Sequence, residues 1–556
     1  MRGFPWAART VLRTLRVKVC LFSKVEESLP GRDRTVAGTW FVSEAFYRGS
    51  ALDKANLDLN LETLCDRLPE LDGRFALLSA TKQGVIAATD ALGCGSIYYA
   101  ERNDTFWVSS HLGPLLASLE GSVSLDPVGT VGVLASLGPV AGLTPFQDIH
   151  RLKTGELIQS KYLDPRAAGP ATEIRRYFNL GSWASSLGEE TISPFDRDEL
   201  FTSILQRQIQ LRATDSTPVI SLSGGRDSRA LLMASLGCKD IDASTYSFGD
   251  PKALDPRIGR MVAGHFGVRN QSQPDFDWDF STFAQEIISV AGGTSSLRNG
   301  YLLAGYSNAP GNRLMFSGFL GDALTGGHFP ATAYPDAVAA QSLVLAQTGR
   351  ADSRFDGVFA IELDQIRELV YQSYSALEPL PDHHKFQLVD LTQRQAGWIN
   401  GLNEVSDVFT DMRCPFASKE VIAFFLSIPY EELVAQKFYD NWSRHQFREH
   451  RVATPAAFIW STLGPHTAAR LSKNALRLLG NRRDIDWQSR LERSRGFFED
   501  ALRMWSVDER LGEFCAEELS QPFGRRAPIS LHGLAILGAL AQSRRQQDLT
   551  EVSDQL

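Results

Sequence analysis

Two different patterns of hydrophobic and polar positions divide the chain near residue 180. Before it, short apolar and aromatic segments alternate with polar positions and are separated by turns, as in the run GRFALLSATKQGVIAATD that begins at Gly73. This alternation is typical of antiparallel strands. After it, helical periodicity alternates with short apolar runs, which is typical of α/β domains with a parallel sheet. Residues 164–194 are rich in Pro, Gly, Ser and Ala and form the expected boundary.

The stretch PVISLSGGRDSRALLMASLG, residues 218–237, predicts a strand that turns sharply into a helix. Val219 to Leu222 has the β-branched, apolar character of a buried strand, and residues 229–236 are good helix formers closed by Gly237. Between them, Gly224 and Gly225 let the backbone approach an anion that the helix N-terminus favours. The turn is therefore predicted to hold phosphate.

Asp227 lies in this turn, where a carboxylate would repel phosphate unless a cation stood between them. Mg²⁺ fits that role, because it binds one or two carboxylates together with phosphate oxygens. The stretch lacks the lysine of a P-loop. An ordinary glycine turn of an α/β domain is the alternative interpretation.

The turn resembles the S-G-G-x-D-S loop of ATP pyrophosphatases. In that family the loop binds the β- and γ-phosphates of ATP while a carboxylate attacks the α-phosphorus, which gives an acyl-adenylate. The resemblance implies ATP and Mg²⁺ as cofactors. It also implies a nucleotide site that includes Leu222, Ser223, Gly224, Gly225, Asp227 and Ser228.

Composition narrows the class of protein. A chain of 556 residues is too long for one domain with a single hydrophobic core, so two or more domains are expected. A content of 43% hydrophobic and 22% charged residues is typical of a globular protein. The six cysteines have no C-x-x-C spacing, which favours a reducing, cytoplasmic compartment and no structural metal. The sequence has no apolar run of about 18 residues and carries a net charge of −8. We therefore expect neither a membrane nor nucleic acid as a partner.

The first half resembles the glutaminase domain of asparagine synthetases. Four segments carry this resemblance in order: LDGRFALL at 71–78, DALGCGSIYYA at 90–100, SSHLGPLLA at 109–117 and TPFQDIHRLKTGELI at 144–158. The resemblance implies an α+β domain with an antiparallel β-sandwich over residues 1–180. It also implies an α/β, asparagine synthetase-like ATP-pyrophosphatase domain with a parallel sheet over residues 190–556.

The glutaminase chemistry is missing from this domain. In that family a cysteine directly after the initiator methionine is the nucleophile, and its own α-amino group is the base. Here Arg2 follows Met1, and Cys20 is internal. We therefore expect a degenerate class II glutamine amidotransferase-like scaffold that makes no ammonia, with Cys20 as a strand thiol.

Two further segments of the second half resemble the nucleotide site of asparagine synthetases. TYSFGD at 245–250 resembles the segment that lines the adenine pocket, which implies a role for Phe248. MFSGFLGDALTGGH at 315–328 resembles S-G-E-G-A-D-E-L-F-G-G. The resemblance places Ser317 and Gly318 at the nucleotide and pairs Asp322 with Asp227 at the metal.

The catalytic residues implied by the resemblance lie further along the chain. DMRCPFASKEVIAFFLSIP at 411–429 resembles E-x-R-x-P-F-L-D, with Asp411 in place of the glutamate. Asp411 is a candidate base for the amine, and a carboxylate paired with Arg413 is the alternative interpretation. RHQFR at 444–448 stands where the family has K-x-x-L-R, so Arg444 and Arg448 are the implied cations for phosphate charge.

Phe319 is the most informative departure from these families. Asparagine synthetases have a glutamate in this position and β-lactam synthetases a tyrosine, and Phe319 can replace neither. The combination is most similar to the lasso-peptide cyclases, which adenylate a side-chain carboxylate of a precursor peptide and close a macrolactam with its N-terminal amine. Their partners are the core peptide, a leader peptidase and a leader-binding protein. A synthetase of small-molecule amides or lactams, an inactive ATP-binding regulator and a tRNA-modifying pyrophosphatase are the alternatives.

Overall fold

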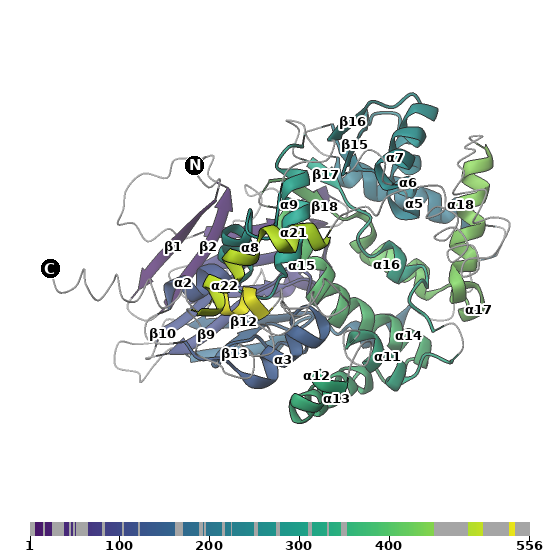
Figure 1. The fold of residues 1–556 in the computed structure, drawn as a ribbon. Helices are drawn as coiled ribbons and strands as arrows, with labels where there is room; N and C mark the ends of the chain where they lie inside the picture. Colours follow the sequence, from purple (N-terminus) through teal and green to yellow (C-terminus); the bar gives the residue numbers. More distant parts are fainter. Residues whose placement is uncertain are drawn as a thin grey trace.

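The computed structural model describes most of the chain between residues 65 and 449 and shorter segments outside it. The described residues are 6–14, 17–24, 38–43, 46–47, 50–51, 65–80, 84–102, 105–119, 123–161, 171–187, 193, 196–213, 217–223, 225–249, 254–273, 278–309, 314–330, 333–345, 353–407, 409–449, 487–503 and 533–539. Figure 1 shows the N-terminal strands on one side of the molecule and the later strands, with their helices, on the other.

Two five-stranded sheets form most of the N-terminal half, beside a small three-stranded sheet of β4 (Phe46–Tyr47), β5 (Ser50–Ala51) and β6 (Leu71–Asp72). One has the order β1-β2-β10-β9-β11 and the other β13-β12-β8-β7-β3. All neighbours are antiparallel except β10 and β2, which are parallel. The strands of the first sheet are Trp6–Thr14, Val17–Lys24, Thr105–Ser109, Tyr98–Arg102 and Ile149–Arg151, and those of the second are Ala171–Arg176, Glu156–Lys161, Gly84–Thr89, Phe75–Ala80 and Gly38–Ser43, each in sheet order.

One apolar cluster joins these two sheets. It contains Leu78, Val85 and Ile158 from one sheet together with Phe106 and Val108 from the other. All five side chains are at most 1% exposed. The sheets therefore pack face to face, and the antiparallel architecture predicted for this half is confirmed.

A five-stranded parallel sheet organises the second half. Its order is β16-β15-β14-β17-β18, and every neighbouring pair is parallel. The strands are Asn270–Gln273, Ser244–Phe248, Val219–Ser221, Leu314–Phe316 and Asp411–Arg413. Because β14 is first in the chain and central in the sheet, the strand order reverses between β14 and β17. Open parallel sheets bind their ligands at the carboxyl ends of the strands beside such a reversal.

Two groups of helices lie beside the parallel sheet. In Figure 1, α5 (Arg197–Arg212), α6 (Arg226–Leu236) and α7 (Leu254–His265) gather beside β15 and β16. The helices α9 (Gly300–Tyr306) and α15 (Asn400–Ser406) lie beside β17 and β18. The parallel-sheet α/β architecture predicted for this half is thereby confirmed.

Two buried arginines fasten the halves together. Arg74, which is 1% exposed, donates to Asp407 Oδ2 at 2.8 Å and to the Met412 carbonyl at 3.0 Å. Arg151 donates to the Ala396 carbonyl at 3.1 Å. A buried guanidinium needs such partners, because an uncompensated buried charge is costly. These contacts fix α15 and β18 against the N-terminal sheets.

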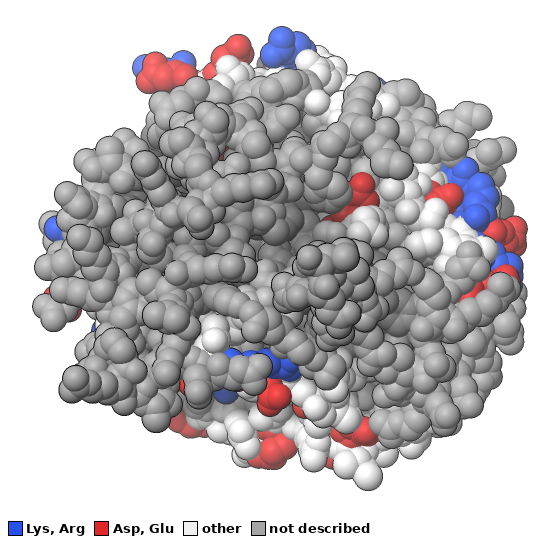
Figure 2. Space-filling view, turned by 90° about the vertical axis from the view of Figure 1, so that its left-hand side faces the viewer, with Lys and Arg blue, Asp and Glu red and all other residues white. Residues whose placement is uncertain are grey.

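Charged side chains of both signs and free thiols occur in the described part of the molecule. Figure 2 shows Lys and Arg side chains beside Asp and Glu around the coloured part of one face. The described cysteines, Cys65, Cys94, Cys238 and Cys414, are reduced thiols. Cys20 lies on β2, and its side chain is outside the described residues. None of the helices in the described ranges is both long and apolar enough to cross a membrane.

Candidate active site at the centre of the parallel sheet

The segments that follow β14 and β17 line one open pocket with a cavity volume of about 290 Å³. This volume is near the lower end of the range of small-molecule sites. The pocket brings together most of the predicted nucleotide residues, namely Ser223, Gly225, Asp227, Ser228, Ser317 and Gly318. Its place at the reversal of strand order is where the topology alone predicts a ligand.

The first wall of the pocket is the turn from β14 into α6. Helix α6 begins at Arg226, earlier than the periodicity predicted, and its N-cap Gly225 supplies no side-chain hydrogen bond. The Ser223 hydroxyl accepts from the Gly225 amide at 3.0 Å and lies 3.2 Å from the Ser228 hydroxyl. The amides of the first turn and two hydroxyls therefore gather at one end of the pocket.

Gly225 itself has an ordinary backbone conformation, with φ −70° and ψ 157°. A Cβ added there would come no closer than 3.1 Å to the Ser223 hydroxyl. The backbone at Gly225 therefore does not itself require glycine, since any residue adopts this extended conformation. Gly224 lies outside the described residues.

The second wall is the turn from β17 into α10 (Gly321–Leu324), and its glycines touch Asp227. A Cβ on Gly318 would lie 2.7 Å from Asp227 Cβ, and one on Gly321 would lie 2.4 Å from Asp227 Cγ. Leu320, between them, has φ 73°, which is unusual for a residue with a side chain. The second turn therefore approaches Asp227 so closely that only glycine fits at both positions. Asp227 packs directly against this turn.

Asp227 and Asp322 form the charged part of the site. Burial, followed by the neighbouring Asp322 carboxylate, raises the pKa of Asp227 to about 6. The Tyr439 hydroxyl opposes this shift by donating to Asp227 Oδ1 at 3.0 Å. Two carboxylates that repel each other beside the first turn of α6 fit a divalent cation, which would relieve the repulsion.

This pair alone does not make a complete metal cage. Within the described ranges, no group of three or more His, Cys, Asp or Glu side chains is arranged to hold a metal ion. A cation on Asp227 and Asp322 would therefore complete its coordination with phosphate oxygens and water. Mg²⁺ binds in that way, because it keeps several waters and takes few protein ligands.

His328 connects Asp322 to the protein interior. Its Nδ1 donates to the buried Asp390 Oδ2 at 2.6 Å, and its Nε2 lies 3.3 Å from Asp322 Oδ2. Burial opposes the imidazolium charge, but Asp390 and Asp322 outweigh it and raise the pKa of His328 to about 9. In turn, the hydrogen bond from His328 holds the pKa of Asp322 below its usual range.

This bridge predicts a pH-dependent stability. The pKa of His328 rises from 6.5 to about 9 on folding, so its contribution of about 3 kcal/mol is complete below pH 6.5 and is lost as the pH rises through about 9. Thermal unfolding of the wild type between about pH 6 and about pH 10 measures this loss. His328→Gln should flatten the curve, whereas the exposed His150→Gln should not. Parallel curves for the wild type and His328→Gln would contradict the bridge.

Gln436 ties both turns to the segment before α18 (Lys437–Glu449). Its Nε2 donates to Asp322 Oδ1 at 2.9 Å, and its Oε1 accepts from Arg226. Arg226 also pairs with Asp440 of α18 and thus points away from the pocket. Gln436 has φ 58°, an unusual conformation for a residue with a side chain. This backbone conformation lets the side-chain amide of Gln436 contact Arg226 in the first turn and Asp322 in the second.

Two predicted nucleotide residues pack beside the pocket without lining it. Leu222 is 2% exposed, its amide donates to the Tyr246 carbonyl, and its carbonyl accepts from the Ser247 hydroxyl. The Phe248 ring packs on Tyr301 and Tyr306 of α9, with ring centroids 5.4 and 5.2 Å away. Both residues support the wall at the carboxyl ends of the strands.

Two of the predicted catalytic residues, Asp411 and Arg444, are not among the described residues that line the pocket. Both side-chain oxygens of Asp411 accept hydrogen bonds from Arg413, at 3.0 and 2.8 Å. This contact agrees with the alternative interpretation of Asp411 as a carboxylate paired with Arg413. Arg444 is half-buried on α18. Arg448 is on the same helix, and its side chain is outside the described residues. Their catalytic roles stay predictions.

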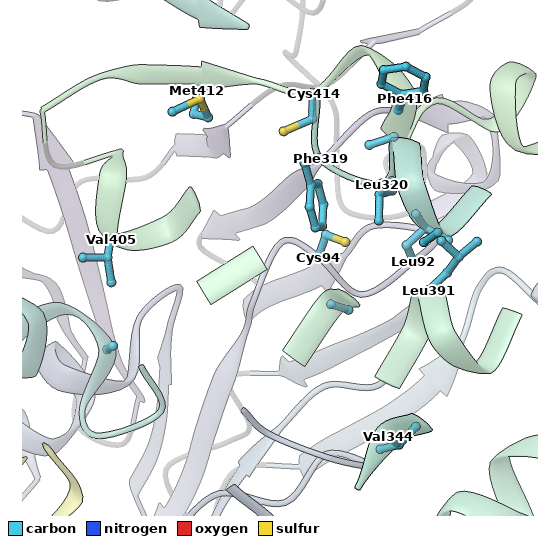
Figure 3. Close-up of a cluster of buried hydrophobic side chains, with 14 of the residues drawn as sticks. Leu92, Cys94, Phe319, Leu320, Val344, Leu391, Val405, Met412, Cys414 and Phe416 are labelled. Carbon is cyan, nitrogen blue, oxygen red and sulfur yellow. The ribbon is translucent and has the colours of Figure 1, made fainter. Parts of the chain in front are cut away.

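Phe319 closes the pocket on the side of the N-terminal half. It lines the pocket and is 6% exposed. Figure 3 shows its ring between Cys94, from the N-terminal half, and Cys414, with Leu320 beside it. By resemblance, residue 319 stands where asparagine synthetases have a glutamate and β-lactam synthetases a tyrosine. In this protein it is part of an apolar contact between the two halves.

Several residues of the site carry no signal in the sequence. Tyr439 and Gln436 belong to no motif, and their contacts with Asp227 and Asp322 arise only when distant segments fold together. His328 ends the segment 315–328 but has no counterpart in the family pattern, so its contact with Asp322 carried no signal either. A scan against protein-family models finds no match to the chain, and a search of curated proteins finds none either.

Proposed function

We propose that this protein is an AMP-forming carbon–nitrogen ligase that adenylates a side-chain carboxylate of a precursor peptide and closes a macrolactam with the N-terminal amine of that peptide. The observation that carries the proposal is the convergence of Asp227 and Asp322, from the turns after β14 and β17, beside the pocket at the first turn of α6. The N-terminal half would be a glutaminase-like scaffold, and the second half an ATP-pyrophosphatase domain.

The pocket residues have separate tasks in this reaction. The Ser223 and Ser228 hydroxyls and the first amides of α6 would bind the β- and γ-phosphates of ATP. Asp227 and Asp322 would hold Mg²⁺, which supplies charge neutralisation for the phosphates when bound. Tyr439 and His328 keep these two carboxylates in place. Arg444 and Arg448 are the proposed cations for the departing pyrophosphate.

Two bond exchanges complete the chemistry. A substrate carboxylate oxygen bonds to the α-phosphorus as the bond to pyrophosphate breaks. The peptide's amine nitrogen then bonds to the acyl carbon as the bond to AMP breaks, and the amine loses a proton. Asp411 is the proposed acceptor of this proton and must release Arg413 to act. Holding the two reacting groups of one chain together is worth about 7–11 kcal/mol in well-oriented cases.

The apolar environment of Phe319 favours a substrate amine over ammonia as the nucleophile. Neither the Phe319 ring nor its neighbours Cys94 and Leu320 offers a carboxylate to bind ammonium. A peptide that carries its own amine to the acyl carbon needs no such group.

Product analysis tests the proposal. The protein is incubated with ATP, Mg²⁺ and a library of synthetic peptides that each carry one aspartate or glutamate. We expect AMP, pyrophosphate and a peptide that has lost one water. Formation of ADP, or product that appears only when glutamine is added, would refute it.

A further inference from the structure

The remaining wall of the pocket is built from α9, α15 and the residues next to them. Its lining residues are Leu302, Tyr306, Ile399, Leu402, Asn403, Ser406 and Met412. Among the described residues that line the pocket, Asp227 is the only one with a charge. A ligand that reaches this wall therefore meets an apolar surface with a few neutral polar groups.

Asn403 is the polar group of this wall that lacks a partner. It is 7% exposed and lines the pocket. Its Nδ2 is buried and, among the residues that the structure describes, no atom accepts a hydrogen bond from it. Buried amide donors are nearly always paired, because leaving one unpaired costs free energy.

The other polar side chains of α15 are satisfied within the protein. Asn400 Nδ2 donates to the Cys94 carbonyl at 2.5 Å, and the Ser406 hydroxyl donates to the Leu402 carbonyl at 2.7 Å. The Asn403 carbonyl accepts from the Asp407 amide, a backbone contact that any residue could make. The fold thus gives no reason for an amide side chain at residue 403, and the pocket does.

The sheet decides which part of a ligand reaches Asn403. Phe248, on the predicted adenine side, belongs to β15, whereas Met412, which shares the wall with Asn403, belongs to β18. These strands lie on opposite sides of β14, whose turn would hold the phosphates. The group beyond the phosphates on the β18 side is therefore the acyl group and not the nucleoside.

We propose that Asn403 binds the acyl substrate by donating a hydrogen bond from Nδ2 to the acyl carbonyl oxygen. The inference rests on the proposed function and adds the residue that recognises the acid. A neutral donor suits the carbonyl of an activated acid, which has lost the negative charge of the carboxylate. The adjoining Leu302, Ile399 and Leu402 favour an uncharged, apolar environment around that carbonyl.

Two stable ligands that differ only in the acyl group test the inference. They are 5′-O-(N-acetylsulfamoyl)adenosine, which carries a carbonyl in the acyl position, and 5′-O-sulfamoyladenosine, which lacks it. Calorimetry gives the Kd of each for the wild type and for Asn403→Ala. We expect Asn403→Ala to raise the Kd of the acetylated ligand about tenfold and that of the other ligand by less than about twofold.

Two variants accompany this comparison. Asn403→Asp keeps the side-chain size but faces the carbonyl with an acceptor, so it should weaken the acetylated ligand at least as much. Asn308→Ala removes an amide that donates to the Ala304 carbonyl outside the pocket and should change neither Kd. An equal loss for both ligands in Asn403→Ala would overturn the inference, and so would no loss for either. Wild-type protein that binds neither ligand would instead refute the proposed function itself.

Discussion

Asp227→Asn will abolish AMP formation and will also make the protein more stable to heat. The amide cannot hold Mg²⁺ as a carboxylate does, and we expect a loss of more than about a hundredfold in rate. Because the pKa of Asp227 is raised from 3.8 to about 6, its ionised form costs up to about 3 kcal/mol at neutral pH, and the amide removes that cost. AMP assays and thermal unfolding of the same preparations measure both effects.

Asp322→Asn is the contrasting variant. It should lose AMP formation to a similar degree but should destabilise the protein, because the pKa of Asp322 is lowered by its hydrogen bond with His328. The stabilisation by Asp227→Asn should vanish as the pH falls from about 6 toward 3.8. Asp364→Asn, at a surface carboxylate that is 76% exposed, should change neither property. An active Asp227→Asn variant, or one less stable than the wild type, would contradict this account of the site.

Gly321→Ala is the second change with a large expected effect. Its Cβ would lie 2.4 Å from Asp227 Cγ, a distance that real Cβ contacts essentially never show. Either Asp227 or the second turn must move, so we expect AMP formation to fall about a hundredfold, with a loss of stability of about 1–3 kcal/mol. The AMP assay and thermal unfolding detect these changes.

Gly264→Ala is the matched control for this substitution. Gly264 lies in α7, and a Cβ there would meet no atom within 4 Å. Alanine is favoured over glycine in a helix by about 1 kcal/mol, so this variant should be fully active and slightly more stable. Full activity in Gly321→Ala would show that the position of Asp227 against the second turn is irrelevant to catalysis.

The sequence predicted the parts of the fold and site that depend on local pattern. Period-two alternation indicated the antiparallel strands, such as Phe75–Ala80. The short apolar run before the glycines indicated β14. The resemblance to asparagine synthetases implied that Asp227 and Asp322 would be paired, and a parallel sheet, which brings the carboxyl ends of its strands to one edge, is compatible with that pairing.

The sequence could not predict contacts that depend on how remote segments pack. Gln436 reaches both turns only because Ala435 and Gln436 adopt positive φ values. Asn403 lines the pocket because Arg74 and its partners fix α15 against the N-terminal sheets. Gly225, by contrast, looked special in sequence and has an ordinary conformation, whereas a Cβ at Gly321 would collide with Asp227.

Isotope transfer from the substrate acid tests the central claim most directly. Peptides of the library are labelled with ¹⁸O in the side-chain carboxyl group and incubated with the protein, ATP and Mg²⁺, and the nucleotide products are analysed by mass spectrometry. If the carboxylate attacks the α-phosphorus, one labelled oxygen remains on AMP when the amine displaces it. We predict labelled AMP. Label in inorganic phosphate together with ADP, or AMP without label, would contradict the account.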